Sequence, residues 1–389
     1  MNMSNIKLYL ENNSNYNLKN KQSQEYGAPY VRPCALDTFL TQHEIDYQCV
    51  AFDDCDYNTW YPVNIYFFDF DCDYFTYFDN LTLDKIRNKK LRVLFIYSEP
   101  DDPYLIEKRL QELCDLNAID RMGVFLLTGN TVSDQISGQG YLQYHEFLYE
   151  QQNKTASNLA TANLKEKKYT CLNRIHKQYR KEFVWNLWNN DLIDNNYVSY
   201  GNVPNIDTQG NFDIVNDGFI VDQTKRISYI PNTFDELLPF KADKLTATEH
   251  NNHSINVDYF HTNSYWNIAM ETYLDAVGGT FLTEKTFKPI KHGQAFIILG
   301  TENSLALLKD QGYKTFARWI DESYDTITDV RFRWYAVFEE TRKIALKSLE
   351  QLHQDYLAQL PIIHHNQEHF KRNKQAQLVK CLQRLTAQQ

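Results

Sequence analysis

A charged helical segment followed at once by a short apolar run constrains the fold more than any other part of this sequence. Residues 283–290 are Thr-Glu-Lys-Thr-Phe-Lys-Pro-Ile, and after Gly293 the chain continues through Ala-Phe-Ile-Ile-Leu to Gly300. An apolar run this short and unbroken predicts a strand buried on both faces of a parallel sheet. A helix that leads directly into such a strand is typical of α/β folds, in which helices cover the sheet.

The start of this helix has the features of a phosphate site. Thr283 is a good N-cap residue, which places Glu284 and Lys285 in the first turn, where unpaired N–H groups and the helix dipole favour an anion. Lys288 adds a positive charge one turn further on. A diphosphate bound beside Lys285 leaves Glu284 to accept hydrogen bonds from ribose hydroxyls. The alternative is an ordinary solvated helix start. Under either interpretation Pro289 is expected to bend the helix or to shift its start.

Strands and helices alternate through the N-terminal half in the same way. We predict strands at residues 6–10, 47–51, 63–70, 92–97 and 124–127, and helices at residues 35–43, 81–89 and 104–116. This order predicts an α/β fold with a mainly parallel sheet. Residues 151–166 are small and polar, so we expect a linker and a domain boundary there.

The C-terminal half repeats this alternation. We predict strands at residues 169–172 and 197–200, a helix at 176–189, further elements at 265–274 and 284–299, and long helices at 330–360 and 371–385. Residues 202–256 are polar with few periodic signals, which indicates a loop-rich insertion or a lid. The chain of 389 residues is long enough for two domains.

The composition argues against several classes of protein. The net charge of −10 argues against bulk binding to nucleic acid or to an anionic membrane. No apolar run approaches the roughly 20 residues of a membrane helix, and residues 1–5 show no basic start of a secretory signal. The seven cysteines form no CxxC pair, which is typical of a reducing compartment. We therefore expect a cytoplasmic protein.

A basic segment follows the predicted strand at residues 169–172. Ligands in open α/β sheets bind at the carboxyl ends of the strands, and residues 173–181 gather basic side chains there. Arg174 and Arg180 are suited to bidentate hydrogen bonds with a diphosphate. The alternative is a basic, solvated helix start, although cations at a helix N-terminus oppose its dipole unless an anion is present.

An acidic segment follows the predicted strand at residues 92–97. The chain there is Tyr-Ser-Glu-Pro-Asp-Asp-Pro, and Glu99 is placed for general-base work on an acceptor hydroxyl. The proline residues are expected to hold the turn rigid. The alternative is a solvated acidic loop on the surface.

Two patterns suggest a metal site. Asp69-Phe70-Asp71 is the pair of carboxylates that metal-dependent GT-A glycosyltransferases use to hold a divalent cation. The same alternation also fits a strand with Phe68, Phe70 and Cys72 inward and the aspartates in water. A second pattern, His364, His365 and His369, is interpreted as a solvent-exposed tract with no structural role.

The order of several segments resembles a known family. Residues 266–272 (WNIAMET), 281–285 (FLTEK) and 293–300 (GQAFIILG) resemble the donor-binding signature of fucosyltransferase-like glycosyltransferases. The resemblance is closer still to the glycosyltransferase-like proteins of large phages, in which Glu-Lys-x-x-Lys-Pro-Ile precedes Asp-Glu-Ser-Tyr-Asp, here residues 321–325. Residues 180–187 and 199–201 are similar to earlier parts of the family pattern. The resemblance extends over about half the chain, residues 169–345.

This resemblance implies a GT-B-like fold of two Rossmann-like domains with a C-terminal helical extension. Residues 1–160 would receive the acceptor. Residues 161–345, with a polar insertion at 202–256, would bind the nucleoside-diphosphate sugar, and residues 346–389 would form the extension. The location would be the cytoplasm of a host cell if the chain is viral.

The resemblance also assigns residues to roles. Glu284 would bind the ribose, Lys285 and Arg180 the diphosphate, and Glu271 would line the donor pocket, while Thr283, Lys288 and Arg174 are assigned by position. No metal or cofactor is expected, because cationic side chains stabilise the leaving diphosphate.

Glu99 is the expected base of an inverting transfer. The family has Glu-Ser-Pro where this chain has Ser98-Glu99-Pro100, and a slip of one residue in an extended segment turns a side chain to the opposite face. Two alternatives stay open: a GT-A-type enzyme that uses Asp69 and Asp71, and a non-catalytic protein that binds a nucleotide sugar or glycan. The sequence leaves the sugar open, and also the acceptor, which can be a glycan, a protein or a modified nucleobase.

Overall fold

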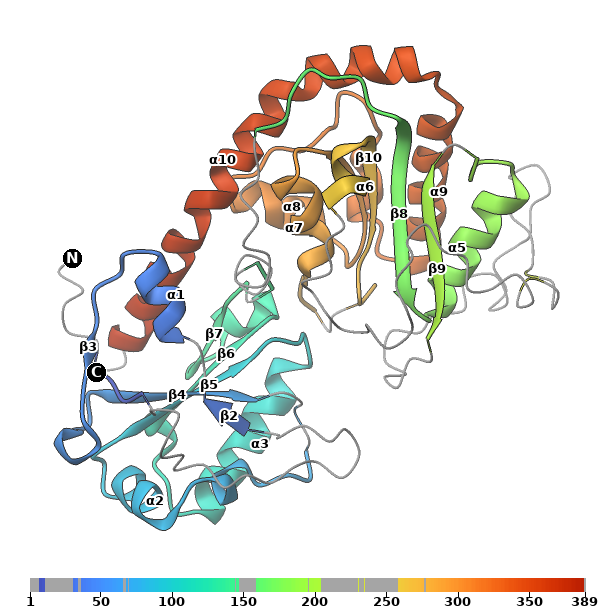
Figure 1. Cartoon of the computed structure of the whole chain (residues 1–389). Coiled ribbons are helices and arrows are strands. Elements are labelled where there is room, and N and C mark those ends of the chain that lie inside the picture. The colour runs from blue at the N-terminus through green and yellow to red at the C-terminus, as the bar shows by residue number, and fades with distance from the viewer. Residues whose placement is uncertain are drawn as a thin grey trace. The chain divides into compact units, whose positions relative to one another are not determined.

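The computed structural model describes most of the chain (Figure 1). The described residues are 7–10, 31–33, 36–65, 68, 70–143, 145–146, 159–194, 196–203, 230, 234, 258–275 and 278–387. The expected insertion at residues 202–256 therefore lies almost wholly outside the described residues, as does the first half of the expected linker at residues 151–166.

The chain forms two compact units. Unit 1 contains Met1–Phe147, Ala276–Phe281 and Arg372–Gln389, and unit 2 contains Leu148–Asp275 and Leu282–Lys371. Residues 372–389, which were expected within a C-terminal helical extension, thus group with the N-terminal part of the chain.

Unit 1 is built on a sheet in which all strand pairs except one are parallel. The strand order is β3-β1-β4-β5-β6-β7, and β2 pairs antiparallel with β4. The strands are β1 (Lys7–Leu8), β2 (Val31–Pro33), β3 (Gln48–Cys49), β4 (Thr59–Ile65), β5 (Arg92–Tyr97), β6 (Val124–Thr128) and β7 (Gln139–Tyr141). The helices are α1 (Leu36–Gln42), α2 (Asn80–Arg87) and α3 (Pro103–Leu116). The α/β prediction is confirmed for this unit.

Helix α3 shows how local sequence produces the elements of unit 1. Asp102 is the N-cap and accepts a hydrogen bond of 2.9 Å from the backbone N–H of Tyr104. Pro103 follows in the first turn, where its missing N–H costs nothing. The side chains of Ile106, Leu110 and Leu113 lie on one face at helical spacing and are fully buried.

The strand expected at residues 63–70 is observed earlier, at Thr59–Ile65. Its backbone pairs with β5 from Trp60 onward, so Ile65 lies opposite Tyr97, the last residue of β5. Phe70 is 43% exposed in a turn, which shows that the expectation of Phe70 facing inward is wrong. Pairing with the neighbouring strand, which the apolar pattern of a single segment does not report, sets the limits of β4.

The last part of the chain completes unit 1. From Arg372 onward, helix α10 (Leu349–Ala387) buries Leu378, Leu382 and Leu385. Its Lys380 Nζ lies 2.6 Å from Asp134 Oδ2, and its Arg384 donates a hydrogen bond of 2.7 Å to the Gln139 carbonyl.

Unit 2 is built on a wholly parallel sheet with the strand order β11-β10-β8-β9. The strands are β8 (Lys167–Ile175), β9 (Tyr197–Val203), β10 (Ser264–Met270) and β11 (Ala295–Leu299). The helices are α5 (Gln178–Asn189), α6 (Asp258–Thr262), α7 (Glu284–Lys291), α8 (Ser304–Asp310), α9 (Val330–Leu346) and α10 (Leu349–Ala387). Helix α7 packs on β10 and β11, and α9 packs on β8 and β11.

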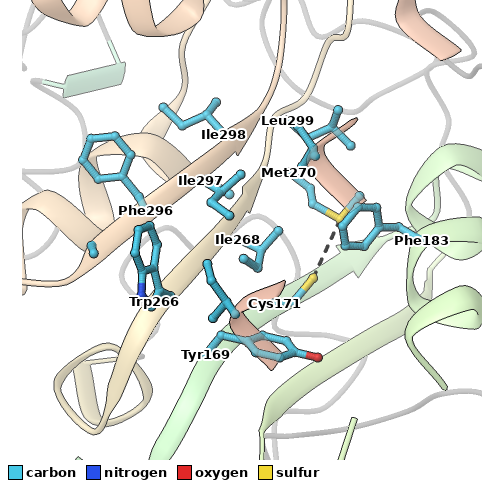
Figure 2. Close-up of a cluster of buried hydrophobic side chains, with 14 of the residues drawn as sticks. Tyr169, Cys171, Phe183, Trp266, Ile268, Met270, Phe296, Ile297, Ile298 and Leu299 are labelled. Carbon is cyan, nitrogen blue, oxygen red and sulfur yellow. Dashed lines mark hydrogen bonds between the residues drawn. The ribbon is translucent and has the colours of Figure 1, made fainter. Parts of the chain in front are cut away.

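The core of unit 2 confirms the buried strand predicted after Gly293. Every residue of β11 is buried, and Ile297 lies opposite Ile268 of β10 (Figure 2). In the same cluster the Cys171 thiol donates to the sulfur of Met270 at 3.8 Å. Burial raises the pKa of Cys171 to about 12, so this thiol is an apolar core group rather than a nucleophile.

The turn between α7 and β11 depends on two residues. Gly293 has a φ of 69° just after the end of α7, a conformation that glycine adopts without strain, and a Cβ there would lie 2.6 Å from that of Ala160. The Gln294 amide is buried and donates to Ser264 Oγ at 2.6 Å and to the Trp266 carbonyl at 2.7 Å. Gln294 therefore joins the turn to β10.

The helical pattern expected as one helix at residues 330–360 forms two. Helix α9 ends at Leu346, and α10 begins at Leu349. Ser348 Oγ accepts from the N–H of Gln351 at 3.2 Å, and Gln351 Oε1 accepts from the N–H of Ser348 at 2.9 Å. This reciprocal capping starts a new helix, which continues through Pro361 to Ala387, so the second helix expected at residues 371–385 is part of it.

None of the helices in the described part of the chain combines the length and apolarity needed to cross a membrane.

We predict that His261 makes the stability of unit 2 fall in mild acid. Burial, with a smaller contribution from His292, lowers the pKa of His261 to about 3. Its ring stacks on that of His292 at 5.6 Å, and its Nδ1 is 2.8 Å from Gln294 Oε1. Because the folded state holds the ring neutral, unfolding takes up a proton below about pH 6.5, and stability falls as the pH drops from there toward 3.

The measurement is the melting temperature between pH 7.5 and 5. The wild type should lose stability by as much as about 1.4 kcal/mol per pH unit from this residue, and His261→Asn should show a flatter profile. Gln354→Asn, at an exposed position of α10, is the matched control and should keep the wild-type slope. Equal slopes in all three proteins would contradict the prediction.

Candidate functional site

The N-terminus of α7 lies where the sequence predicted it. Thr283 is the N-cap, and its Oγ1 accepts a hydrogen bond of 3.4 Å from the backbone N–H of Lys285. Glu284 and Lys285 form the first turn, as predicted. Pro289 neither moves this start nor ends the helix, which continues to Lys291.

Glu271 anchors this helix start to the sheet. It follows the last residue of β10 and is fully buried. Its carboxylate accepts hydrogen bonds from the N–H of Thr283 at 3.0 Å, from the Thr283 hydroxyl, and from the Thr286 hydroxyl at 2.6 Å. A Cβ at residue 300 would lie 3.2 Å from Glu271 Cγ, so Gly300 leaves room for this side chain. A buried carboxylate thus orients the first turn of α7.

Glu284, Lys285 and Lys288 form a compact charged group on α7. Lys285 Nζ lies 3.0 Å and Lys288 Nζ 3.8 Å from Glu284 Oε1. Lys285 also donates to Thr272 Oγ1 at 3.1 Å. The Glu284 side chain is 9% exposed, whereas those of Lys285 and Lys288 are 27% and 20% exposed. The two lysine side chains are therefore partly exposed beside a largely covered carboxylate, an arrangement that suits an anion.

Arg180 lies beneath the end of β10 and is 3% exposed. Its guanidinium donates to the carbonyl of Glu271 at 2.6 Å and to that of Met270 at 3.1 Å. The hydroxyl of Tyr179 donates to the same Glu271 carbonyl, and burial raises the pKa of Tyr179 to about 12. The structure thus shows Arg180 holding the backbone of the site, and its expected contact with a diphosphate stays a prediction.

The rest of the basic segment at residues 173–181 is not a solvated helix start. Lys177 is 2% exposed, and its Nζ lies 5.0 Å from the centre of the Tyr273 ring. His176 Nδ1 is 2.6 Å from the Tyr200 hydroxyl. Arg174 belongs to β8, which extends to Ile175 rather than ending at residue 172, and its side chain lies outside the described part of the structure.

The segment at residues 321–325 has a structural role that its sequence did not reveal. The Asp325 carboxylate accepts from the N–H groups of Leu305 at 2.7 Å and Ala306 at 2.9 Å, at the start of α8. Burial raises the pKa of Asp325. Glu322 accepts from the N–H of Phe316 at 2.6 Å. These contacts explain the acidic residues of this part of the family pattern without a ligand.

Glu99 lies in unit 1, two residues beyond the end of β5. Its side chain is 28% exposed, and its Oε1 is 3.9 Å from Nε2 of His145. The strand end before it was predicted at the correct residue, Tyr97. No sequence pattern indicated His145, because the two residues are brought together by the sheet and are far apart in the chain.

Among the described residues, neither metal hypothesis is supported by a group of suitable ligands. Asp69 lies outside the described residues, and Asp71 is exposed in a turn. Within the described ranges, no group of three or more histidine, cysteine, aspartate and glutamate side chains is arranged to hold a metal ion.

The histidine tract has a structural role, so its expected lack of one is wrong. In α10, His364 Nε2 lies 2.7 Å from the Ala160 carbonyl, His365 Nε2 2.9 Å from that of Gly312, and His369 Nε2 2.6 Å from that of Gln311. These carbonyls belong to loops of unit 2. The tract holds loops against α10.

Comparison with family models, with curated proteins and with solved structures found no match to this chain.

We predict that Glu271→Gln destabilises unit 2 by about 1 to 3 kcal/mol. The amide keeps the shape of the carboxylate but has only one acceptor oxygen. Its NH₂ group must therefore face one of the groups that donate to Glu271, either on Thr283 or on Thr286, and that donor loses its hydrogen bond. Urea unfolding measures the change. Glu368→Gln, an exposed glutamate on α10, is the control and should change stability by less than about 0.5 kcal/mol. A Glu271→Gln protein as stable as this control would refute the anchoring role.

Proposed function

We propose that this chain is an inverting, metal-independent glycosyltransferase of GT-B-like architecture. It would move a sugar from a nucleoside-diphosphate sugar to an acceptor hydroxyl. The observation that carries the proposal is the start of α7, where a buried glutamate orients the helix and two partly exposed lysines lie in its first turns.

The position of this helix start supports donor binding. It follows the carboxyl end of β10 in a parallel sheet, the edge at which open α/β sheets bind their ligands. The dipole of α7 and the charges of Lys285 and Lys288 favour a diphosphate there. The same two cations would stabilise the charge that develops on the departing diphosphate.

Glu284 has a separate task in this scheme. Its carboxylate is fixed between the two lysines, and an ionised carboxylate accepts strong hydrogen bonds from hydroxyl groups. It would hold the ribose of the donor while the lysines hold the diphosphate. In this scheme the acidic residue and the basic residues at the start of α7 bind different parts of the same nucleotide.

Glu99 would serve as the base in unit 1. It takes the proton of the acceptor hydroxyl while that oxygen attacks the anomeric carbon. The bond from that carbon to the diphosphate breaks on the opposite side, which inverts the configuration. Its place beyond the end of β5, with a partly exposed carboxylate, is compatible with this role.

We predict that a nucleotide sugar raises the melting temperature through the α7 start. The panel contains GDP-fucose, GDP-mannose, UDP-glucose and UDP-N-acetylglucosamine, and a ligand at a hundred times its dissociation constant adds about 2.7 kcal/mol of stability. Lys285→Ala and Glu284→Ala should each reduce the shift, because they remove a contact with the diphosphate or the ribose. Lys371→Ala, an exposed lysine of α10, is the matched control and should keep it.

Unchanged donor shifts in both Lys285→Ala and Glu284→Ala would refute the site. A donor that binds normally but releases no nucleoside diphosphate with any acceptor would identify a binding protein instead of an enzyme.

We also predict that turnover of the donor persists in EDTA. The lysines on α7 supply the positive charge that a metal supplies in GT-A enzymes. Release of nucleoside diphosphate is measured with EDTA, with added Mg²⁺ and with added Mn²⁺, in the wild type and in Asp71→Asn. Activity that disappears in EDTA and returns with Mn²⁺ would support the alternative that uses Asp69 and Asp71.

A further inference from the structure

Unit 1 places a carboxylate and an imidazole together at one edge of its sheet. Strands β5, β6 and β7 are parallel neighbours, so their carboxyl ends lie at the same edge (Figure 1). Glu99 follows β5 and His145 follows β7. The 3.9 Å between Glu99 Oε1 and His145 Nε2 is ion-pair distance. The imidazole is 11% and the carboxylate 28% exposed, so the pair is covered on the histidine side and accessible on the glutamate side.

Phe281 fixes the imidazole ring. The two rings meet edge to face at 5.4 Å and 82°, a favoured aromatic geometry. Gly129, at the end of β6, makes room for Phe281, since a Cβ there would lie 2.7 Å from Phe281 Cε2 and 2.3 Å from the Ser98 carbonyl. The residue before Glu99 and the ring against His145 therefore pack on the same glycine.

The segment that carries Phe281 is itself fixed in unit 1. The N–H of Thr280 donates to Thr131 Oγ1 at 3.0 Å. A Cβ at Gly279 would lie 1.9 Å from Asn130 Oδ1, so only glycine fits beside that buried amide. The amide of Asn130 in turn donates to the carbonyl of Pro100, the residue after Glu99, at 3.1 Å. Both members of the pair are thus built into one packed arrangement.

The neighbouring carboxylates are held by other groups. Asp101 accepts a hydrogen bond from the Tyr97 hydroxyl. Glu146, next to His145, accepts from the amide of Gln377 at 2.8 Å. Glu99 thus lies within ion-pair distance of the His145 ring.

We propose that Glu99 and His145 act as one coupled proton-accepting pair, with His145 as the positioning residue that finally holds the proton. The proposal deepens the glycosyltransferase function and rests on it. The chemistry favours this order, because imidazole ordinarily has a pKa of about 6.5 and glutamate of about 4.3, so the proton moves to the stronger base.

The step balances without another reagent. The acceptor oxygen bonds to the anomeric carbon, and the bond from that carbon to the diphosphate oxygen breaks, with its electron pair leaving on the diphosphate. The hydroxyl proton passes to the Glu99 carboxylate and then, once the two side chains close from 3.9 Å to hydrogen-bond distance, to Nε2 of His145. The pair ends as a carboxylate beside an imidazolium, and the imidazolium later releases its proton to solvent.

The first test needs no substrate. NMR titration of the imidazole signals in the whole protein gives the pKa of His145 in the wild type and in Glu99→Gln. The carboxylate stabilises the imidazolium, so the pKa of His145 should be lower in the variant. The other histidine signals are the internal control. Glu112→Gln, an exposed glutamate of α3, should leave the signal of His145 unchanged.

The second test is the pH dependence of donor turnover. It uses the panel's most strongly bound nucleotide sugar with water as acceptor, and the readout is release of nucleoside diphosphate. Wild-type kcat should fall in acid as the imidazole protonates, with a midpoint set by His145. In His145→Gln the midpoint should move down toward the carboxylate range, and kcat should fall tenfold or more, while the KM for the donor stays the same.

Each outcome decides the proposal. A His145 pKa that is the same in the wild type and in Glu99→Gln overturns the pair. A coupled pair whose pH profile is unchanged in His145→Gln overturns the proton-accepting role but leaves the proposed function standing. The NMR titration can show a coupled pair while no nucleotide sugar changes the melting temperature. That combination overturns the proposed function and, with it, the role of the pair. A rise in turnover on replacing His145 also counts against it.

Discussion

The buried carboxylate of Glu271 is the contact on which the rest of the candidate donor site depends. A full negative charge is costly to bury unless hydrogen bonds surround it, and here the start of α7 supplies them from Thr283 and Thr286. Tyr179 and Arg180 hold the backbone carbonyl of the same residue. The end of β10 and the first turn of α7 are therefore fixed to each other before any ligand arrives, and the position of Lys285 follows from that.

The sequence predicted best those elements whose cause is local. Most of β5, from Val93 to Tyr97, and the whole of β11 follow from unbroken apolar runs, and α7 begins directly after its N-cap Thr283. The early start of β4 was missed because its limits are set by pairing with β5. The break at residues 347–348 was missed because apolar periodicity continues across it, while a reciprocal cap formed by Ser348 and Gln351 starts a new helix.

The residues of the candidate site also fall into those that local sequence predicted and those whose surroundings only the fold determines. Glu284, Lys285 and Lys288 lie together because one helical turn places them there, so spacing alone was enough. Arg180 is a different case, since its charge suggested a ligand while its surroundings give it backbone carbonyls. The acidic residues 322 and 325 belong to a family-like pattern but serve the fold as helix and loop caps. His145 had no signal in the sequence, because sheet topology rather than spacing brings it to Glu99.

The grouping of the chain has a consequence for its synthesis. The chain passes between the units after residues 147, 275, 281 and 371, so neither unit is one continuous stretch of the gene. On the ribosome, unit 2 has all its residues once residue 371 has been made, whereas unit 1, which begins first, has to wait for the helix that carries Leu378, Leu382 and Leu385. The order of completion is thus the reverse of the order of synthesis. A single crossover within the coding sequence cannot exchange either unit intact.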